Sequence, residues 1–454
     1  MDPIKRPHRI PKRVFQVVES FDTFFKNQSA GGMVLLACVI IALVWANSSY
    51  SVSYFNIIDA KAGIHVGGFE LQKNIGLWIN EGLMTFFFLL AGLEIKREIL
   101  SGELGSLKKA IFPVTISLLG MLLPALIYVY ITWGQDKIIG WAIPMATDIA
   151  FALGLLSILR NKIPRALIVL FSAAVIVDDL GAVIIIAIFF NDSIGYNYLL
   201  AGAFVYALMI LCNRWDIRNL AFYGVLGAIL WYCLLRAGLH ATIAGVLVAF
   251  VIPGRSCYNS VDLHKKLANL MARFKRAITK EGDDTPSDFE NESEKAIVQS
   301  IETTAYHYET PLHRLEHRLH KFITFFVVPV FVLFNSGMII SMGAFHSAAD
   351  DPMVWGIVFG LAVGKFIALG LIPYLLIKFN LVYVSATIKA GDFIPLGILS
   401  GMGFTMSIFI AELALGGNDG WLMSAKLAIL LSSLFCGILG FIALYIRFGF
   451  RKPI

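Results

Sequence analysis

The sequence has few charged residues and few cysteines, and each shortage excludes a class of protein. Only 15% of the 454 residues are charged and 58% are hydrophobic, a balance that no single soluble core of this size requires. The five cysteines stand apart, without the spacing of a disulfide framework or of a zinc site. We therefore expect a polytopic membrane protein without disulfides, structural zinc or a cofactor.

The sequence also lacks signs of nucleic-acid binding and of a cleaved signal peptide. The net charge of +6 comes from lysines and arginines that lie between apolar runs rather than along one exposed face, so no nucleic acid is implied. The basic N-terminus is not followed directly by an apolar segment or by a cleavage site. We expect residues 1–26 to be a cytoplasmic tail with an interfacial helix.

Apolar runs of about 20 residues predict an all-α protein with twelve transmembrane helices. Basic residues collect on alternate connections, which places both termini in the cytoplasm. The predicted spans are 31–47, 75–95, 110–132, 139–159, 166–190, 198–213, 219–235, 240–253, 320–342, 353–377, 391–415 and 422–446. They form two membrane parts, residues 27–254 and 319–454, and a small outer hairpin is expected at 65–71.

Residues 255–318 form a polar insertion between the two membrane parts. A basic stretch within 265–280 precedes an acidic stretch within 281–294. Because the segment is too polar for a core of its own, we expect a charged cytoplasmic loop that is largely disordered. Its composition fits either a regulatory segment or a solvated linker.

Two adjacent carboxylates, Asp178 and Asp179, lie in the middle of the predicted span 166–190. One Asp at the centre of a membrane helix costs roughly 2.5–3.5 kcal/mol, so a pair is tolerated where water, a cation or a counter-charge receives it. The pair indicates a cavity or ion pathway, and the alternative is a polar contact between helices. Lys365 lies equally deep in span 353–377, so we predict that it pairs with Asp148, Asp178 or Asp179.

Two predicted spans contain helix-breaking residues beside polar ones. The fourth span has Pro144 just before Thr147 and Asp148, and the eleventh has three glycines around Ser400 and Thr405. Interrupted spans at corresponding places in two halves indicate a transporter site. If spans three to five and ten to twelve are inverted repeats, the two interruptions cross near the midplane. The alternative is that glycine and proline serve close helix packing.

Six motifs on these spans resemble the bacterial NhaA-type sodium/proton antiporters. The resemblance extends from about residue 20 to the C-terminus. The motifs are Ala146-Thr-Asp-Ile-Ala-Phe-Ala-Leu-Gly154, Val177-Asp-Asp-Leu-Gly-Ala182, Gly92-Leu-Glu-Ile-Lys-Arg-Glu98, Leu239-His-Ala-Thr-Ile-Ala-Gly245, Gly364-Lys365 and Gly403-Phe-Thr-Met-Ser-Ile-Phe-Ile410. This family is itself a standard example of inverted-repeat transporters, so the resemblance implies two broken helices that cross at the midplane.

The resemblance also implies roles for individual residues. Asp178 and Asp179 would form the ion and proton site, with Thr147 and Asp148 beside it. Lys365 would pair with Asp178 when sodium is absent, and Lys365 and Asp148 would offset the partial charges of the half-helix ends.

Six further residues match positions linked in the family to pH activation. They are Glu94, Glu98, Glu316, His317 and His320 near the cytoplasmic funnel and His240 on the outer side. An imidazole titrates near neutral pH, which fits a sensor, but a satisfied surface or interfacial histidine is equally consistent with the sequence.

The implied activity is exchange of intracellular Na+ or Li+ for external H+ across the bacterial inner membrane, for sodium and pH homeostasis. If both Asp178 and Asp179 reload with protons, two protons move per sodium and exchange is electrogenic. The protein would be a pH-regulated transporter and not an enzyme. Its expected partners are Na+, Li+, H+, the lipid bilayer and a second copy in a homodimer.

Two other functions stay open from the sequence. A sodium-coupled solute symporter shares the broken helices, although it should have more polar residues in spans four, five and eleven. An intramembrane aspartyl protease would use Asp148 with Asp178, but the chain contains no Gly-x-Gly-Asp motif.

Overall fold

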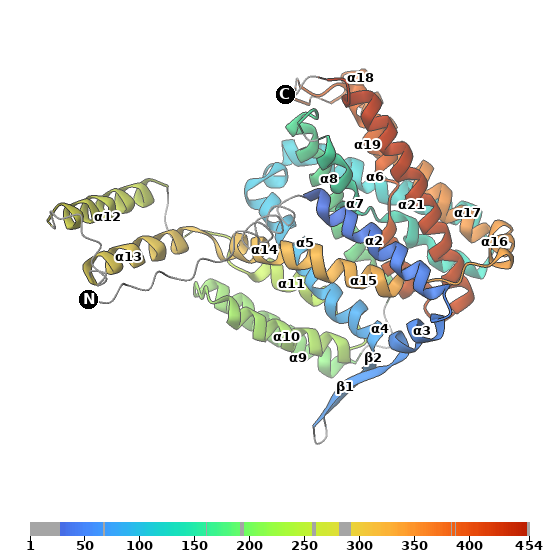
Figure 1. Cartoon of the computed structure of the whole chain (residues 1–454), viewed down its shortest axis with the longest axis horizontal. Helices are drawn as coiled ribbons and strands as arrows, with labels where there is room; N and C mark the ends of the chain where they lie inside the picture. The colour runs from blue at the N-terminus through green and yellow to red at the C-terminus, as the bar shows by residue number, and fades with distance from the viewer. Residues whose placement is uncertain are drawn as a thin grey trace, which may run out of the picture.

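The computed structural model describes residues 28–66, 69–159, 161–190, 195–256, 260–280, 292–382, 384–385 and 387–451. In these ranges the protein is mostly helical, as predicted, and its one sheet has two strands (Figure 1). The interfacial helix expected within residues 1–26 and the acidic residues of 281–291 lie outside the described ranges.

The first half of the chain contains the hairpin and ten of the labelled α-helices. These elements are α2 (Gln28–Ala46), α3 (Ser51–Asp59), β1 (Lys61–Val66), β2 (Phe69–Asn74), α4 (Ile75–Leu77), η1 (Trp78–Leu83), α5 (Met84–Ser101), η2 (Glu103–Gly105), α6 (Leu107–Ile131), η3 (Asp136–Met145), α7 (Ile149–Ile158), α8 (Arg165–Phe189), α9 (Tyr196–Arg214), α10 (Leu220–Arg236) and α11 (Ile243–Val251).

The second half begins with the polar insertion and ends with the longest helix described. These elements are α12 (Ser260–Lys280), α13 (Glu292–Tyr308), α14 (Pro311–Phe322), η4 (Ile323–Val327), α15 (Val328–Asn335), α16 (Met342–Ala349), α17 (Pro352–Phe359), η5 (Gly360–Gly364), η6 (Ile367–Leu371), α18 (Ile372–Lys378), η7 (Ala390–Asp392), α19 (Phe393–Leu399), α20 (Phe404–Leu415) and α21 (Asp419–Phe448).

Fewer of the described helices have the length and apolarity of a membrane span than the twelve spans that we predicted. Within the described ranges, eight segments are long enough and apolar enough to cross a membrane. The number is ten if each of two bent helix pairs counts as one span, whereas twelve were expected. The predicted span 240–253 holds only the nine-residue α11, about 14 Å long and less than half of a hydrocarbon core. Gly238, with φ of +78°, stands in the turn after α10, and Pro253 forces Ile252 into an extended conformation after α11.

Both predicted interruptions are present. Residues 146–148 separate η3 from α7, and residues 400–403 separate α19 from α20 with a bend of 48°. The two breaks touch, because a Cβ on Gly403 would lie 2.8 Å from the carbonyl oxygen of Ala146. Glycine at 403 is therefore required for the close approach of the two chains.

The expected hairpin is present as the antiparallel strands β1 and β2. Lys61 pairs with Asn74 at its base and Val66 with Phe69 near its tip. The indole of Trp78 donates to the carbonyl of Ala62 at 2.8 Å, which holds the base of the hairpin against the bundle.

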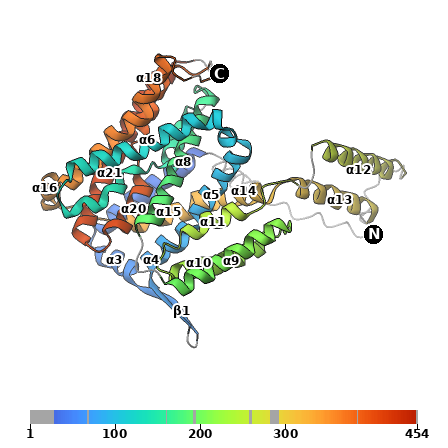
Figure 2. The same ribbon diagram turned by 180° about the vertical axis from the view of Figure 1, so that it is seen from behind.

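The polar insertion differs from the disordered loop that we predicted. Its described residues form helices α12 and α13, which lie side by side and project from the bundle (Figures 1 and 2). The apolar residues of α12 recur at helical spacing, and Leu270 of α12 and Ile297 of α13 are buried. The composition alone did not predict that these two helices pack against each other through a few apolar residues.

Three clusters of buried apolar residues hold the membrane helices together. One apolar core joins α5, α9, α10 and α11, where α11 lies along α5. Another joins α6, α8, α19 and α21, and a third joins α2, α5, η3, α15, α17 and α20 and includes Ala146 and Phe404 beside the two interruptions. The interrupted helices are therefore held between packed, continuous ones.

Candidate functional site

Asp148 joins the two interrupted helices. Its backbone N donates to the carbonyl of Met402 at 2.7 Å, and its Oδ2 accepts from the backbone N and the Oγ1 of Thr405, at 2.9 and 2.6 Å. Its Oδ1 accepts from the backbone N of Phe151 at 3.2 Å and so caps α7. One carboxylate thus accepts from one free N–H group at the start of α7 and from another at the start of α20.

Replacing Thr405 by Val should weaken this junction. Valine has the shape of threonine but loses the hydroxyl bond to a buried carboxylate, and such a bond contributes roughly 1.5–3 kcal/mol. We expect a lower melting temperature in detergent, and Thr405→Ser, which keeps the hydroxyl, should restore most of it. If both variants have the same melting temperature as the native protein, the hydroxyl of Thr405 does not stabilise the junction.

The far ends of the four half-helices are also anchored, either to α21 or to residues that flank α17 or α21. These contacts are Lys137 to Asp351 at 2.7 Å for η3, Lys162 to the carbonyl of Gly449 for α7, Asp392 to Arg447 and Arg451 at 2.8 and 3.0 Å for α19, and Glu412 to Lys426 at 2.6 Å for α20. The junction at Asp148 is therefore the inner end of helices that are fixed at their outer ends.

Lys365 has the internal partner that we predicted. Its Nζ lies 2.6 Å from Oδ2 of Asp178 on α8, and the two side chains are 0% and 1% exposed. Lys365 follows the π-helical turn η5, and the turn η6 begins two residues later. A fully buried pair of this kind requires both partners, because either one alone leaves an uncompensated charge.

Asp179 differs from its neighbour because it has no bonding partner. It is 1% exposed, and neither carboxylate oxygen has a hydrogen-bond partner among the described residues. Oδ1 of Asp178 and Oγ1 of Thr147 are likewise buried and unbonded. Buried polar atoms are normally bonded, so this group of oxygens indicates a site that a ligand completes.

The oxygens of this group suit a small, hard cation or a proton. Carboxylate and hydroxyl oxygens are typical ligands of hard cations, whereas transition metals favour nitrogen and sulfur. In the described part of the chain, no group of three or more His, Cys, Asp or Glu residues could hold a metal ion.

A cavity of ≈ 470 Å³ lies between α2, α5, α7, α8 and α14, and Asp179 is on its wall. Four of the predicted pH-linked residues, Glu94, Glu316, His317 and His320, line it together with Asp179. The structure thus brings residues from α5, α8 and α14 to one water-accessible space. Arg97 and His313, which we did not predict, line it as well.

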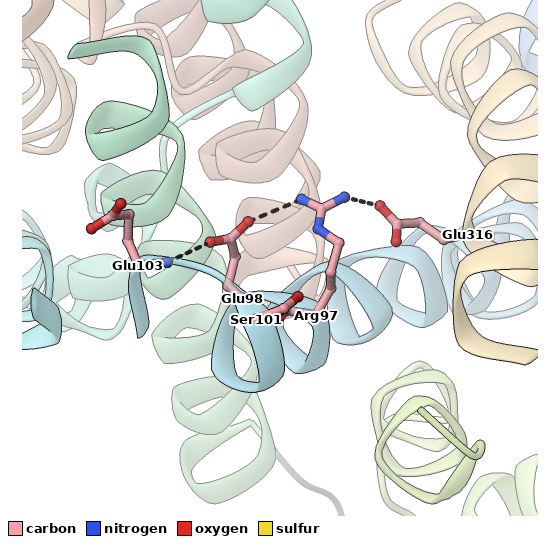
Figure 3. A network of polar contacts seen from close by, with 5 residues as sticks. All are labelled: Arg97, Glu98, Ser101, Glu103 and Glu316. Carbon is pink, nitrogen blue, oxygen red and sulfur yellow. Dashed lines mark hydrogen bonds and ion pairs between the residues drawn. The ribbon is translucent and has the colours of Figure 1, made fainter. Parts of the chain in front are cut away.

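Glu98 lies beside the cavity rather than on its wall, and Arg97 links it to Glu316 (Figure 3). Arg97 Nη2 lies 3.1 Å from Oε1 of Glu98, and its Nη1 donates to Oε1 of Glu316. Oε2 of Glu98 accepts from the backbone N of Glu103 at 3.1 Å. This network connects the end of α5 with α14.

His240 is not brought to the cavity. It precedes α11 and is partly buried. At the other end of α11, the carbonyl oxygens of Phe250 and Ile252 accept hydrogen bonds from Nζ of Lys96 on α5. His240 therefore does not share the space that four of the other predicted pH-linked residues line.

The sequence offered weak signals for the residues that we missed. Thr405 was noted as a polar residue of the eleventh span but not assigned to the site, although it is the second residue of α20, where the first N–H groups of a helix need acceptors. Arg97 lies three residues after Glu94 and next to Glu98, a spacing that places it among acids on one helix surface.

A family model described as Na+/H+ antiporter 1 matches residues 22–444. A protein of Saccharophagus degradans named Na(+)/H(+) antiporter NhaA 1 is 38% identical over 437 residues, 96% of this chain and 93% of its own length. The Na(+)/H(+) antiporter NhaA of Oleidesulfovibrio alaskensis is 39% identical over 447 residues, 98% of each chain. The Na(+)/H(+) antiporter NhaA 2 of Syntrophotalea carbinolica is 39% identical over 435 residues, 96% of this chain and 98% of its own.

Proposed function

Because the chain belongs to the Na+/H+ antiporter 1 family, it is a membrane transporter that exchanges Na+ for H+ and not an enzyme, and we propose that Asp178 and Asp179 bind both ions. One observation carries this proposal: Asp179 is buried, it lines the cavity, and neither of its carboxylate oxygens has a hydrogen-bond partner among the described residues. A buried carboxylate without a hydrogen-bond partner is stabilised when it binds either a cation or a proton.

Competition for the same oxygens is sufficient for exchange. Asp179, Oδ1 of Asp178 and Oγ1 of Thr147 provide oxygens for Na+ or Li+, and the carboxylates take up protons when the ion leaves. Asp178 and Asp179 are adjacent and Lys365 Nζ lies 2.6 Å from Asp178, so we treat the three groups as one coupled set for proton uptake. If this set takes up two protons per Na+, exchange moves net charge and the membrane potential drives sodium out of the cell.

Lys365 and Asp148 complete the electrostatics of the site. Asp148 lies where the N-terminal ends of α7 and α20 meet, and its negative charge offsets their positive partial charges. Lys365 offsets Asp178 when no sodium is bound. These contacts also argue against an aspartyl protease, because Asp148 and Asp178 are each bonded to a different partner.

The proposed architecture is the twelve-span, inverted-repeat fold of this family in the bacterial inner membrane, with residues 255–318 on the cytoplasmic side. The touching interruptions at 146–148 and 400–403 support the crossing of two broken helices. The end of α21 and the connection with Lys162 lie on one face, which also carries Arg447 and Arg451. A basic face of this kind supports cytoplasmic termini. We also propose that two copies of the protein form a homodimer.

Proton flux in everted membrane vesicles tests the exchange directly. Addition of NaCl or LiCl should release the accumulated protons, and KCl should serve as the comparison cation. Proteoliposomes with a clamped membrane potential test electrogenicity, because unequal exchange responds to voltage and one-for-one exchange does not.

We further propose that Glu94, Glu98, Glu316, His317 and His320 set the pH dependence, and that His240 contributes from the outer side. The support is that four of these residues share a cavity with Asp179 and that Arg97 ties Glu98 to Glu316. A change in their charge therefore acts on the same space through which ions reach Asp179.

Neutralising the two ends of one ion pair should move the pH profile in opposite directions. Glu316→Gln removes a negative charge, so the remaining carboxylates ionise more easily and half-maximal exchange should occur at a pH lower by roughly 0.5–1 unit. Arg97→Gln removes a positive charge and should raise that pH by a similar amount.

The measurement is initial proton flux across a pH series at saturating sodium. Glu103→Gln is the matched control. The backbone N of Glu103 donates to Glu98, but the side chain of Glu103 makes none of the bonds in this network. Shifts of the same sign in the Glu316 and Arg97 variants would contradict an electrostatic role for this network.

A further inference from the structure

A second cavity lies on the opposite side of the protein, under the β-hairpin. It measures ≈ 650 Å³ and is lined by Asp59, Lys61, Gln72, Lys73, Asn74, Leu77 and Arg236. These residues come from the end of α3, the base of the hairpin, the end of α4 and the end of α10, which meet here (Figure 1). The cavity is separate from the ion site and has no role in the exchange described above.

The charges in this cavity favour an anion. Three of its lining residues are cationic and one is acidic, and Lys73 is already paired with Glu81 at 2.5 Å. In the described part of the chain, no ion pair joins Lys61 or Arg236 to a carboxylate. The guanidinium of Arg236 lies instead 5.7 and 6.0 Å from the rings of Tyr198 and Tyr232. Its planar set of N–H donors matches a phosphate.

The same cavity also contains an unused hydrogen-bond acceptor. Oδ1 of Asn74 is buried and has no partner among the described residues, although Asn74 lies on the cavity wall. The acidic Asp59 lies on that wall too. A ligand that fits both sets of groups carries a phosphate and, close to it, an ammonium or hydroxyl donor.

The surroundings indicate that this ligand reaches the cavity from the membrane. The indole rings of Trp78 and Trp231 stack 6.0 Å apart beside the cavity, and Tyr198 and Tyr232 flank Arg236. Aromatic residues of this kind gather where headgroups meet the hydrocarbon. Exposed apolar side chains continue along α9 at Leu200 and Phe204, where acyl chains can lie.

We propose that this cavity binds the headgroup of a phospholipid, with its phosphate at Lys61 and Arg236 and its ammonium or hydroxyl donor at Asn74 and Asp59. The bound lipid connects the hairpin to α10. Phosphatidylethanolamine and phosphatidylglycerol carry both the phosphate and the donor, whereas phosphatidylcholine lacks the donor and inorganic phosphate lacks the acyl chains.

Native mass spectrometry of the delipidated full chain, titrated with each lipid, tests the proposal. We expect phosphatidylethanolamine and phosphatidylglycerol to bind more tightly than phosphatidylcholine. The double variant Lys61→Gln/Arg236→Gln should weaken their binding by about tenfold or more, since each charge-assisted bond is strong. The control is Lys109→Gln, which removes an exposed cation from the far end of the bundle and should leave binding unchanged.

Sodium-driven proton flux at saturating sodium should be the same in all these variants, which separates this site from the ion site. Equal lipid binding by the double variant and the native protein would overturn the proposal. Protection from thermal unfolding by inorganic phosphate to the same extent as by the lipids would also overturn it, because the ligand would then be a dissolved anion. Equal affinity for phosphatidylcholine would overturn the role given to Asn74 and Asp59.

Discussion

Replacing Asp179 by Asn should abolish sodium-driven proton release in everted vesicles while the protein remains folded. The amide keeps the shape of the side chain but can neither carry the charge that holds Na+ nor take up the proton. Its stability should be unchanged or higher, because Asp179 has no protein bond to lose in the described part of the chain and a buried, unpaired charge is costly. The measurement is dye dequenching on addition of NaCl, with melting temperature on the same preparation.

Asp178→Asn is the matched comparison, since it makes the same change one residue earlier. Here the lost carboxylate is the partner of Lys365, so we expect both lower activity and a lower melting temperature. Near-native sodium-driven flux in Asp179→Asn would refute the assignment of this residue. Equal destabilisation by both variants would show that the structural difference between the two aspartates has no energetic consequence.

Replacing Lys365 by Ala should have the largest effect on stability. It leaves the carboxylate of Asp178 buried without its only ion-pair partner in the described residues, and loss of one member of such a pair costs roughly 3–5 kcal/mol. We expect a marked fall in melting temperature together with impaired exchange. A stable and fully active Lys365→Ala variant would mean that the ammonium does not balance the charge of this site.

Lys365→Arg separates the two roles that an ammonium can have here. Arginine keeps the positive charge but does not release its proton, whereas a buried lysine can. We expect Lys365→Arg to retain voltage-sensitive exchange, with Asp178 and Asp179 as the proton carriers. Loss of electrogenicity in this variant, measured in voltage-clamped proteoliposomes, would instead assign one of the transported protons to Lys365.

The sequence alone determined the class of the protein and the kinds of residue at its site. Charges inside apolar runs are expensive wherever the helix lies, so Asp178, Asp179 and Lys365 could be identified before any contact was known. Helix-breaking residues act locally, so Pro144 and the glycines near Ser400 marked both interruptions. The twelve predicted spans were less secure, because hydropathy does not register the turn at Gly238 that leaves α11 short.

The tertiary structure decided which of these residues meet. Asp178 and Asp179 point about 100° apart around their helix, so the rotation of α8 in the bundle determines that Asp178 faces Lys365 and Asp179 faces the cavity. The contact between Asp148 and Thr405 joins residues 257 positions apart, and that between Lys365 and Asp178 spans 187 positions. Contacts at such separations depend on how whole helices pack, and no local pattern in the sequence contains that information.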